Sequence, residues 1–180
     1  MIRGTSIILR AMEPQDVDLM MIFENDTDIW PVSGTLVPYS RYTLDQFYKN
    51  AVQDIYTARQ LRLAIELIKE SHRGPTIGYV DLFDFEPQNR RAGVGILIGD
   101  HKERNKGYAT EALKLLCKYA REILNFQQLY CHIDKENKVS LRLFERAGFV
   151  KCGELKDWIV FDGKWRDVTM MQYLRAKPVI

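Results

Sequence analysis

One segment of the sequence restricts the fold of this chain most. It consists of an apolar strand pattern, a short basic loop and a long amphipathic helix pattern. Residues 92–98 are small or branched apolar residues, which predicts a strand. The loop 100–107 holds two lysines and one arginine and ends in Gly107. From there apolar residues recur every three or four positions up to Leu124, which predicts a helix. A strand joined in this way to a helix favours a sheet covered by helices.

The other periodicities predict one mixed α/β domain over residues 1–180. No repeat, low-complexity linker or change of composition divides the chain. We expect, in chain order, a strand at 5–11, helices that start at Pro14 and near Thr43, strands at 61–68, 76–83 and 92–98, a helix from Gly107, a strand at 128–133, a helix at 138–147 and two strands joined at Asp162-Gly163. This order contains about seven strands and about four helices.

The charge balance argues against some classes of partner. Lys and Arg total 26 and Asp and Glu total 24, so the net charge is +2. So small an excess does not favour nonspecific binding to nucleic acid or to an anionic membrane. The longest apolar run, residues 19–23, falls far short of the roughly 20 residues that span a bilayer, and residues 1–5 lack a signal-peptide pattern. We therefore expect a cytoplasmic protein without nucleic-acid or membrane partners.

The cysteines and histidines predict neither a disulfide framework nor a metal site. They are Cys117, Cys131 and Cys152, and His72, His101 and His132. The cysteines are odd in number and lack CxxC spacing, and none of the six residues has the spacing of metal ligands. We expect three reduced thiols and no bound metal.

The loop 100–107 has the properties of an anion site. The first turn of a helix presents unpaired N–H groups and the positive end of the helix dipole, which suit a pyrophosphate. Gly107 lets the backbone approach a phosphate closely, and Lys102, Arg104 and Lys106 supply positive charge. The charges alone would fit an ordinary solvated loop equally well, so the spacing of the residues has to decide.

Residues 104–109 fit the pattern Q/R-x-x-G-x-G/A between a strand and a helix. Further segments follow in a fixed order: 95–100, 108–113, 134–137, 147–149, Asp162-Gly163 and Asp167. In these residues the chain resembles the GNAT superfamily of acetyl-CoA-dependent N-acetyltransferases over about residues 5–175. In detail it is similar to the ribosomal-protein N-terminal acetyltransferases and the spermidine/spermine acetyltransferases. The resemblance implies a central mixed, mostly antiparallel sheet flanked by helices.

The resemblance also implies the residues that bind acetyl-CoA. The pantetheine arm would lie against Ile96 and Ile98, where the strand separates from its neighbour. The pyrophosphate would lie on the main chain of the segment Arg104, Asn105, Lys106, Gly107, Tyr108, Ala109 and Thr110. Asn137 would contact the pantetheine or the acceptor, although an Asn at this place also suits a helix N-cap.

The implied chemistry is direct attack of a neutral amine on the thioester in a ternary complex. An N–H near Leu97 or Ile98 would stabilise the oxyanion. The polyamine enzymes carry a Tyr seven residues after the Asn as the acid for the thiolate, but Phe144 stands there. The ribosomal-protein enzymes carry a Ser three residues after the Asn. Ser140 has that offset and is the expected donor to sulfur, although its hydroxyl could bond its own helix instead.

The proton acceptor is less well defined. Gly93 stands where many relatives carry a Glu. Asp81, Asp84 and Asp157 are the candidates, and Asp84 joins Ser140 in the expected catalytic set. A weak base suits a peptide α-amine better than a polyamine, because the lower pKa of the α-amine saves roughly 3 kcal/mol when it is presented neutral. Residues 34–39 also lack acids.

Three functions therefore remain open. The first is acetyl transfer to a primary amine of a peptide, protein or small molecule. The second is polyamine acetylation. The third is a sensor that binds acetyl-CoA without turnover, because Gly93 and Phe144 replace two acid/base positions. Trp158 and Trp165 near the last turn would also fit a homodimer or higher homo-oligomer.

Overall fold

The computed structural model describes residues 1–51, 54–69 and 73–174. The strands are β1 (Ile2–Arg3), β2 (Ile7–Ala11), β3 (Gln60–Ile68), β4 (Arg73–Glu86), β5 (Arg91–Ile98), β6 (Gln128–Asp134), β7 (Val150–Phe161) and β8 (Lys164–Leu174). The helices are α1 (Asp16–Phe23), α2 (Trp30–Ser33), α3 (Arg41–Ala51), α4 (Ile55–Ala58), α5 (Tyr108–Glu122) and α6 (Lys138–Arg146), with one 3-10 turn at His101–Glu103. His72 and the end of the expected domain beyond residue 174 lie outside the described residues.

All eight strands form one sheet in the order β1-β2-β3-β4-β5-β6-β8-β7. Neighbouring strands are antiparallel except β5 and β6, which are parallel. The predicted mixed, mostly antiparallel sheet is therefore confirmed. The strand count is eight rather than seven, because the two-residue β1 pairs with β2.

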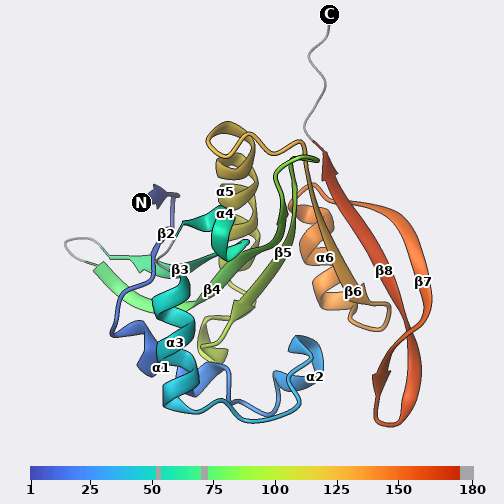
Figure 1. Ribbon diagram of the computed structural model, residues 1–180, viewed down its shortest axis with the longest axis horizontal. Coiled ribbons are helices and arrows are strands. Elements are labelled where there is room, and N and C mark those ends of the chain that lie inside the picture. The colour runs from blue at the N-terminus through green and yellow to red at the C-terminus, as the bar shows by residue number, and fades with distance from the viewer. Residues whose placement is uncertain (52–53, 70–72, 175–180) are drawn as a thin grey trace, which may run out of the picture.

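The helices cover both faces of the sheet (Figure 1). Helices α5 and α6 pack on one face over the larger core cluster, which includes Leu113, Leu116 and Phe144. Helices α1 and α3 pack on the other face over a smaller cluster around Met20, Leu44 and Tyr79. We call this second side the α1 face. No helix among the described residues is long and apolar enough to cross a membrane.

Two helix starts differ from the sequence prediction. Helix α1 begins at Asp16, two residues after Pro14, because the residues before it form a turn. Helix α3 begins at Arg41, and the hydroxyl of Ser40 accepts a hydrogen bond from the N–H of Thr43 at 3.1 Å. Ser40 therefore does the capping that the Thr43 spacing had suggested. The sequence predicts about four helices, and the described residues contain six. The two additional helices, α2 and α4, have only four residues each, too few to show a period.

The parallel strands β5 and β6 separate soon after they meet. Pairing runs only from Arg91 opposite Gln128 to Gly93 opposite Tyr130, although both strands continue. On its other edge β5 stays paired with β4 as far as Ile98. The second half of β5 therefore has a backbone edge that no described strand occupies, and that edge borders the candidate site.

Candidate active site

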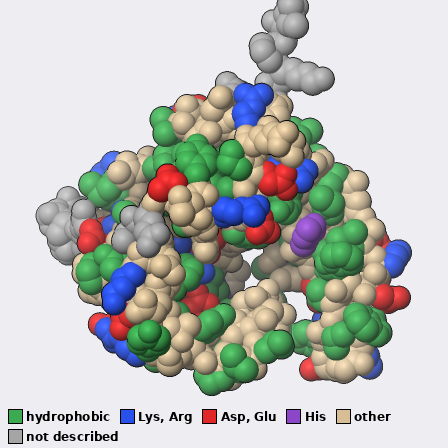
Figure 2. Space-filling model, viewed as in Figure 1, with side chains coloured by type: hydrophobic (Ala, Val, Ile, Leu, Met, Phe, Trp, Pro, Cys, Tyr) green, Lys and Arg blue, Asp and Glu red, His purple; other side chains and the backbone are tan. Residues whose placement is uncertain are grey.

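A cavity of about 670 Å³ lies beside the free edge of β5. It is lined by β5, the loop and first turn of α5, one face of α6, and α2: Asp28, Ile29, Val32, Ile96, Leu97, Ile98, Glu103, Arg104, Asn105, Gly107, Tyr108, Ala109, Thr110, Val139, Ser140, Arg142, Leu143 and Arg146. The structure thus brings most of the predicted cofactor residues together with Ser140. Figure 2 shows the surface hollowed between the α2 segment and the β7–β8 hairpin, where this region opens.

The start of α5 is built as the loop sequence predicts. Gly107 is the N-cap residue and has φ +89°, a left-handed conformation that favours glycine. The side chain of Arg104 donates through Nε to the carbonyl of Ile98 at 2.9 Å, which ties the loop to the end of β5. Lys106 instead pairs with Glu103 at 2.9 Å and is absent from the cavity lining. The open N–H groups of the first turn therefore face the cavity with Arg104 beside them.

Asn137 and Ser140 act together at the start of α6. The Oδ1 atom of Asn137 accepts a hydrogen bond from the N–H of Ser140 at 3.0 Å, so Asn137 caps the helix. Asn137 does not line the cavity, and its predicted contact with a ligand stays a prediction. Ser140 does line the cavity, and its hydroxyl makes no hydrogen bond to any described residue. That hydroxyl is available to a ligand.

The candidate acids lie at different places. Asp81 is held by Arg62 at 2.7 Å, and the same guanidinium contacts Glu24 at 2.5 Å, with all three side chains largely buried on the α1 face. Asp84 is exposed at the irregular end of β4, with φ +50°, and does not line the cavity. Asp157 is exposed on β7. The structure therefore does not bring the predicted Asp84 to Ser140.

Two substitutions relative to the family pattern have a visible structural cause. A Cβ atom built at Gly93 would collide with the ring of Phe83 from β4, so this ring occupies the space of a side chain at that position. Phe144 is buried in the core and packs edge-on against Phe149, with ring centroids 5.0 Å apart. Neither position supplies an acid or a base.

Two of the three cysteines are too deeply buried to act as nucleophiles in the cavity, whereas Cys152 is exposed on β7. Cys117 and Cys131 are buried in the core under α5. Burial raises the pKa of the Cys117 thiol to about 12 and raises the pKa of Cys131 as well. A thiol in this state is a poor nucleophile. No cluster that could hold a metal ion occurs among the described histidines, cysteines and acids.

A second, more open cavity of about 640 Å³ adjoins the first and shares Gly107, Thr110 and Arg146 with it. Lys114 and Lys118 of α5 line it as well. Its one acid, Glu111, accepts hydrogen bonds from the N–H groups of Thr5 and Ser6 at 2.5 and 2.9 Å. Lys114, Lys118 and Arg146 have no acidic partner among the residues described. The sequence prediction missed these cations, although Arg142 and Arg146 have the i, i+4 spacing that places them on one helix face.

Comparisons with known proteins agree with this architecture. The acetyltransferase (GNAT) domain family matches residues 6–150. A spermidine N(1)-acetyltransferase of Vibrio cholerae is 27% identical over 175 residues, which cover 97% of this chain and 96% of the relative. The ribosomal protein uS5 alanine N-acetyltransferase of Escherichia coli is 28% identical over 116 residues, which cover 56% of this chain and 59% of the relative.

Solved structures give the same result. A crystal structure of spermidine N-acetyltransferase from Vibrio cholerae in complex with CoA and spermine superimposes with a TM-score of 0.84 at 26% identity, over 95% of this chain and 96% of that chain. An acetyltransferase of the GNAT family from Bacillus anthracis shares the fold, with a TM-score of 0.80 at 20% identity over 96% and 97% of the two chains. The chain belongs to the GNAT family and is an N-acetyltransferase that uses acetyl-CoA.

Proposed function

We propose that this enzyme transfers acetyl directly from acetyl-CoA to one primary amine and prefers the α-amine of a peptide or protein. The observation that carries the proposal is the cavity that runs from the start of α5 along the free edge of β5 to Ser140. A free strand edge has unpaired N–H and C=O groups, which an extended amide-containing arm can satisfy. The pantetheine arm of acetyl-CoA has that chemistry.

The positive groups suggest where the phosphates bind. The N–H groups in the first turn of α5, with Arg104 beside them, suit the pyrophosphate. Lys114, Lys118 and Arg146 lie around the adjoining cavity and suit a further phosphate, which acetyl-CoA carries on its ribose. This division leaves the far end of the first cavity, near Ser140, for the thioester.

The reaction then needs only short movements of protons. The amine nitrogen forms a bond to the carbonyl carbon while an N–H near Leu97 or Ile98 stabilises the oxyanion. The carbon–sulfur bond breaks and sulfur leaves with the electron pair. The unbonded hydroxyl of Ser140 donates a proton or a hydrogen bond to that sulfur. The proton that the nitrogen loses on becoming an amide passes to solvent or replaces the proton that Ser140 has given.

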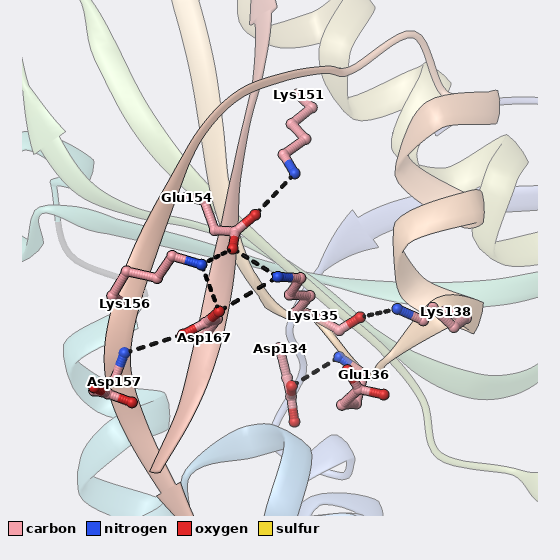
Figure 3. Close-up of polar contacts among 9 residues, drawn as sticks. All are labelled: Asp134, Lys135, Glu136, Lys138, Lys151, Glu154, Lys156, Asp157 and Asp167. Atoms are coloured by element: carbon pink, nitrogen blue, oxygen red, sulfur yellow. Dashed lines mark hydrogen bonds and ion pairs between the residues drawn. The ribbon is translucent and has the colours of Figure 1, made fainter.

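The preference for a singly charged amine rests on how the carboxylates are already used. On the α1 face, Asp81 and Glu24 share Arg62. Figure 3 shows the β7–β8 hairpin, where Glu154 and Asp167 are contacted by three lysines: Lys135, Lys151 and Lys156. These contacts hold the pKa of Glu154 well below its usual range. A polyamine would have to compete with these cations for each carboxylate, whereas one amine would not.

Spermidine is the second candidate acceptor. The spermidine acetyltransferases match almost the whole chain, whereas the ribosomal-protein enzyme matches 56% of it. That likeness favours the polyamine. Two other observations favour the α-amine: Phe144 and Gly93 stand where relatives carry an acid or a base, and the nearby carboxylates are already paired with cations.

Release of free thiol from acetyl-CoA across a panel of amines tests the proposal. The panel contains peptides with free α-amines, the same peptides with blocked α-amines, and spermidine and spermine. We expect the highest kcat/KM for a free α-amine. A clear preference for spermidine would replace the α-amine by the polyamine. Tight binding of acetyl-CoA with no accelerated thiol release for any amine would indicate a sensor instead of an enzyme.

A further inference from the structure

One histidine lies beside the point where β5 and β6 separate. His132 follows two residues after Tyr130, the last residue of β6 that pairs with β5. Its neighbours Cys131 and Ile133 are buried in the core under α5, whereas His132 is exposed. Because side chains alternate along a strand, His132 points to the α1 face. Continuing the parallel register places it level with Gly95 across the gap between the two strands.

On this part of the α1 face the acids other than the exposed Asp84 are paired with cations. On β5 the nearest positions that face this side are Gly93 and Gly95, which have no side chain, and Phe83 covers Gly93. Asp81 is bound to Arg62. His132 makes no hydrogen bond or ion pair with a described residue, and its one ring contact is with Tyr130, at 5.6 Å between centroids.

We propose that His132 accepts the proton of the acceptor amine. The assignment rests on the proposed function, because it supplies the base that the acetyl transfer to an amine requires. The neutral imidazole takes a proton from the ammonium group, directly or through one water, and becomes imidazolium. The freed nitrogen lone pair forms the carbon–nitrogen bond, the carbon–sulfur bond breaks, and the sulfur takes its proton from Ser140. The second proton, which the nitrogen loses on becoming an amide, passes through water to the oxygen of Ser140 and restores its hydroxyl. The imidazolium returns its proton to solvent, which its exposure permits.

Titratable and charged groups lie on both sides of His132. On its own strand Tyr130 lies on one side, and Asp134 on the other side is bound to Arg166 at 3.1 Å. On β8 its direct partner is Met170, which carries no charge. Asp84, Glu86 and Arg91 lie near Tyr130, whose pKa is raised by burial first and by Asp84 second. His132 therefore lies among charges of both signs, of which Asp134 is already paired.

The test is the pH profile of kcat at saturating acceptor for His132→Gln and His132→Glu. For the glutamine variant we expect a loss of about 100-fold at pH 7, the lower end of the range for a positioned base. For the glutamate variant we expect activity to return and the acidic limb of the profile to move to lower pH, because a carboxyl group loses its proton at a lower pH than an imidazole does. Acetyl-CoA affinity and melting temperature should stay as in the unaltered enzyme for both variants.

His101→Gln is the matched control, because it removes a second exposed histidine, which is paired to Asp26 at 2.8 Å. We expect its acidic limb to stay in place. A His132→Gln variant within twofold of the unaltered enzyme would overturn the assignment, and so would a glutamate variant whose acidic limb does not move. An unaltered enzyme with no turnover on any amine would overturn the proposed function itself, and the assignment with it.

Discussion

The spacing between Asn137 and Ser140 identifies Ser140 as a candidate in the sequence, and the structure shows which of its groups are hydrogen-bonded. The offset of three from Asn137 is also the offset of an N-cap bond, and the structure contains that bond to the backbone of Ser140. The hydroxyl is left free and faces the cavity. Backbone and side chain of Ser140 therefore do different things: the first fixes the helix start and the second is available to the leaving sulfur.

Ser140→Ala is expected to lower kcat by about 100-fold, because it removes the donor to the thiolate. The capping bond uses the N–H of residue 140 and remains, so acetyl-CoA affinity and stability should change little. Steady-state kinetics and a titration with acetyl-CoA check both parts. Val139→Ala removes methyl groups from the neighbouring lining residue and serves as the control. An unchanged kcat for Ser140→Ala would remove its role as donor.

Gly107→Ala is expected to weaken acetyl-CoA binding by about tenfold and to lower the free energy of unfolding by about 1 kcal/mol. The residue has φ +89°, and its added methyl group would contact no protein atom within 4 Å, so it would project into open space at the cavity. Gly153→Ala is the matched control, since it also has open space around it but no left-handed φ. Equal affinity in both variants would contradict the position of the phosphate site.

Arg10 and Asp16 form a buried ion pair that links β2 to the start of α1, with an N–O distance of 2.6 Å. Arg10 also contacts Glu66 of β3 at 2.5 Å. Burial on its own would raise the pKa of Asp16, but its bonds to Arg10, to the Glu13 N–H and to Thr76 hold the pKa below its usual value. A carboxyl with a lowered folded-state pKa stabilises the fold above its unfolded pKa, and this contribution is lost as the pH falls through the folded pKa.

We therefore expect the free energy of unfolding to fall as the pH drops below about 4, and Asp16→Asn to remove part of this dependence. At pH 7 the substitution should cost about 3 kcal/mol, because it leaves a buried guanidinium short of one partner. Denaturant unfolding over a pH series measures both effects. Asp18→Asn on the same helix is the control, because Asp18 and its partner Arg41 are exposed. Equal losses for the two variants would contradict the argument.

At the scale of elements, the predictable parts of the fold are those with a clear period. The apolar stripe of α5 could be predicted because the helix shows its buried side within its own sequence. The alternation in β3 predicted a strand, but residues 63–66 are all buried, because helices cover both faces of the sheet there. The separation of β5 from β6 could not be predicted, because it depends on a pairing between distant segments that ends at Gly93. Val32 of α2, which lines the cavity, was missed for another reason, since a four-residue helix has no period.

The β7–β8 hairpin is joined to the β6–α6 turn by the lysine contacts of Glu154 and Asp167 (Figure 3). The three lysine side chains are more exposed than the half-buried Glu154 and Asp167, so each contact exchanges the hydration of a lysine for a partly screened attraction. Glu154→Gln should therefore shift the melting temperature by no more than about 2 °C at physiological salt. Leu155→Gln is a useful contrast in the same strand, because it alters a half-buried apolar residue. A large drop in melting temperature for Glu154→Gln that disappears at high salt would contradict this expectation. It would show that the ion pairs of Glu154 stabilise the hairpin.

At the scale of the whole molecule, the net charge of +2 hides an uneven distribution. Glu24 and Asp81 on the α1 face and Glu154 and Asp167 on the hairpin are paired with cations, whereas Lys114, Lys118 and Arg146 have no acidic partner among the residues described. The composition could predict the absence of a general affinity for polyanions. It could not predict this local excess, because α5 and α6 come together only in the folded chain.

Substitution of Arg146 tests which phosphate of acetyl-CoA this side chain binds. It lines both cavities, so Arg146→Gln should weaken the binding of acetyl-CoA by about tenfold, or ~1.4 kcal/mol, if its partner is the ribose phosphate. Binding of acetyl-dephospho-CoA, which lacks that phosphate, should then be the same for the variant and the unaltered enzyme within twofold. Arg121→Gln, on α5 but outside both cavities and paired with Glu122 at 2.8 Å, should leave both affinities unchanged. Equal losses for the two ligands in Arg146→Gln would move Arg146 to the pyrophosphate, and no loss for either would remove it from the cofactor site.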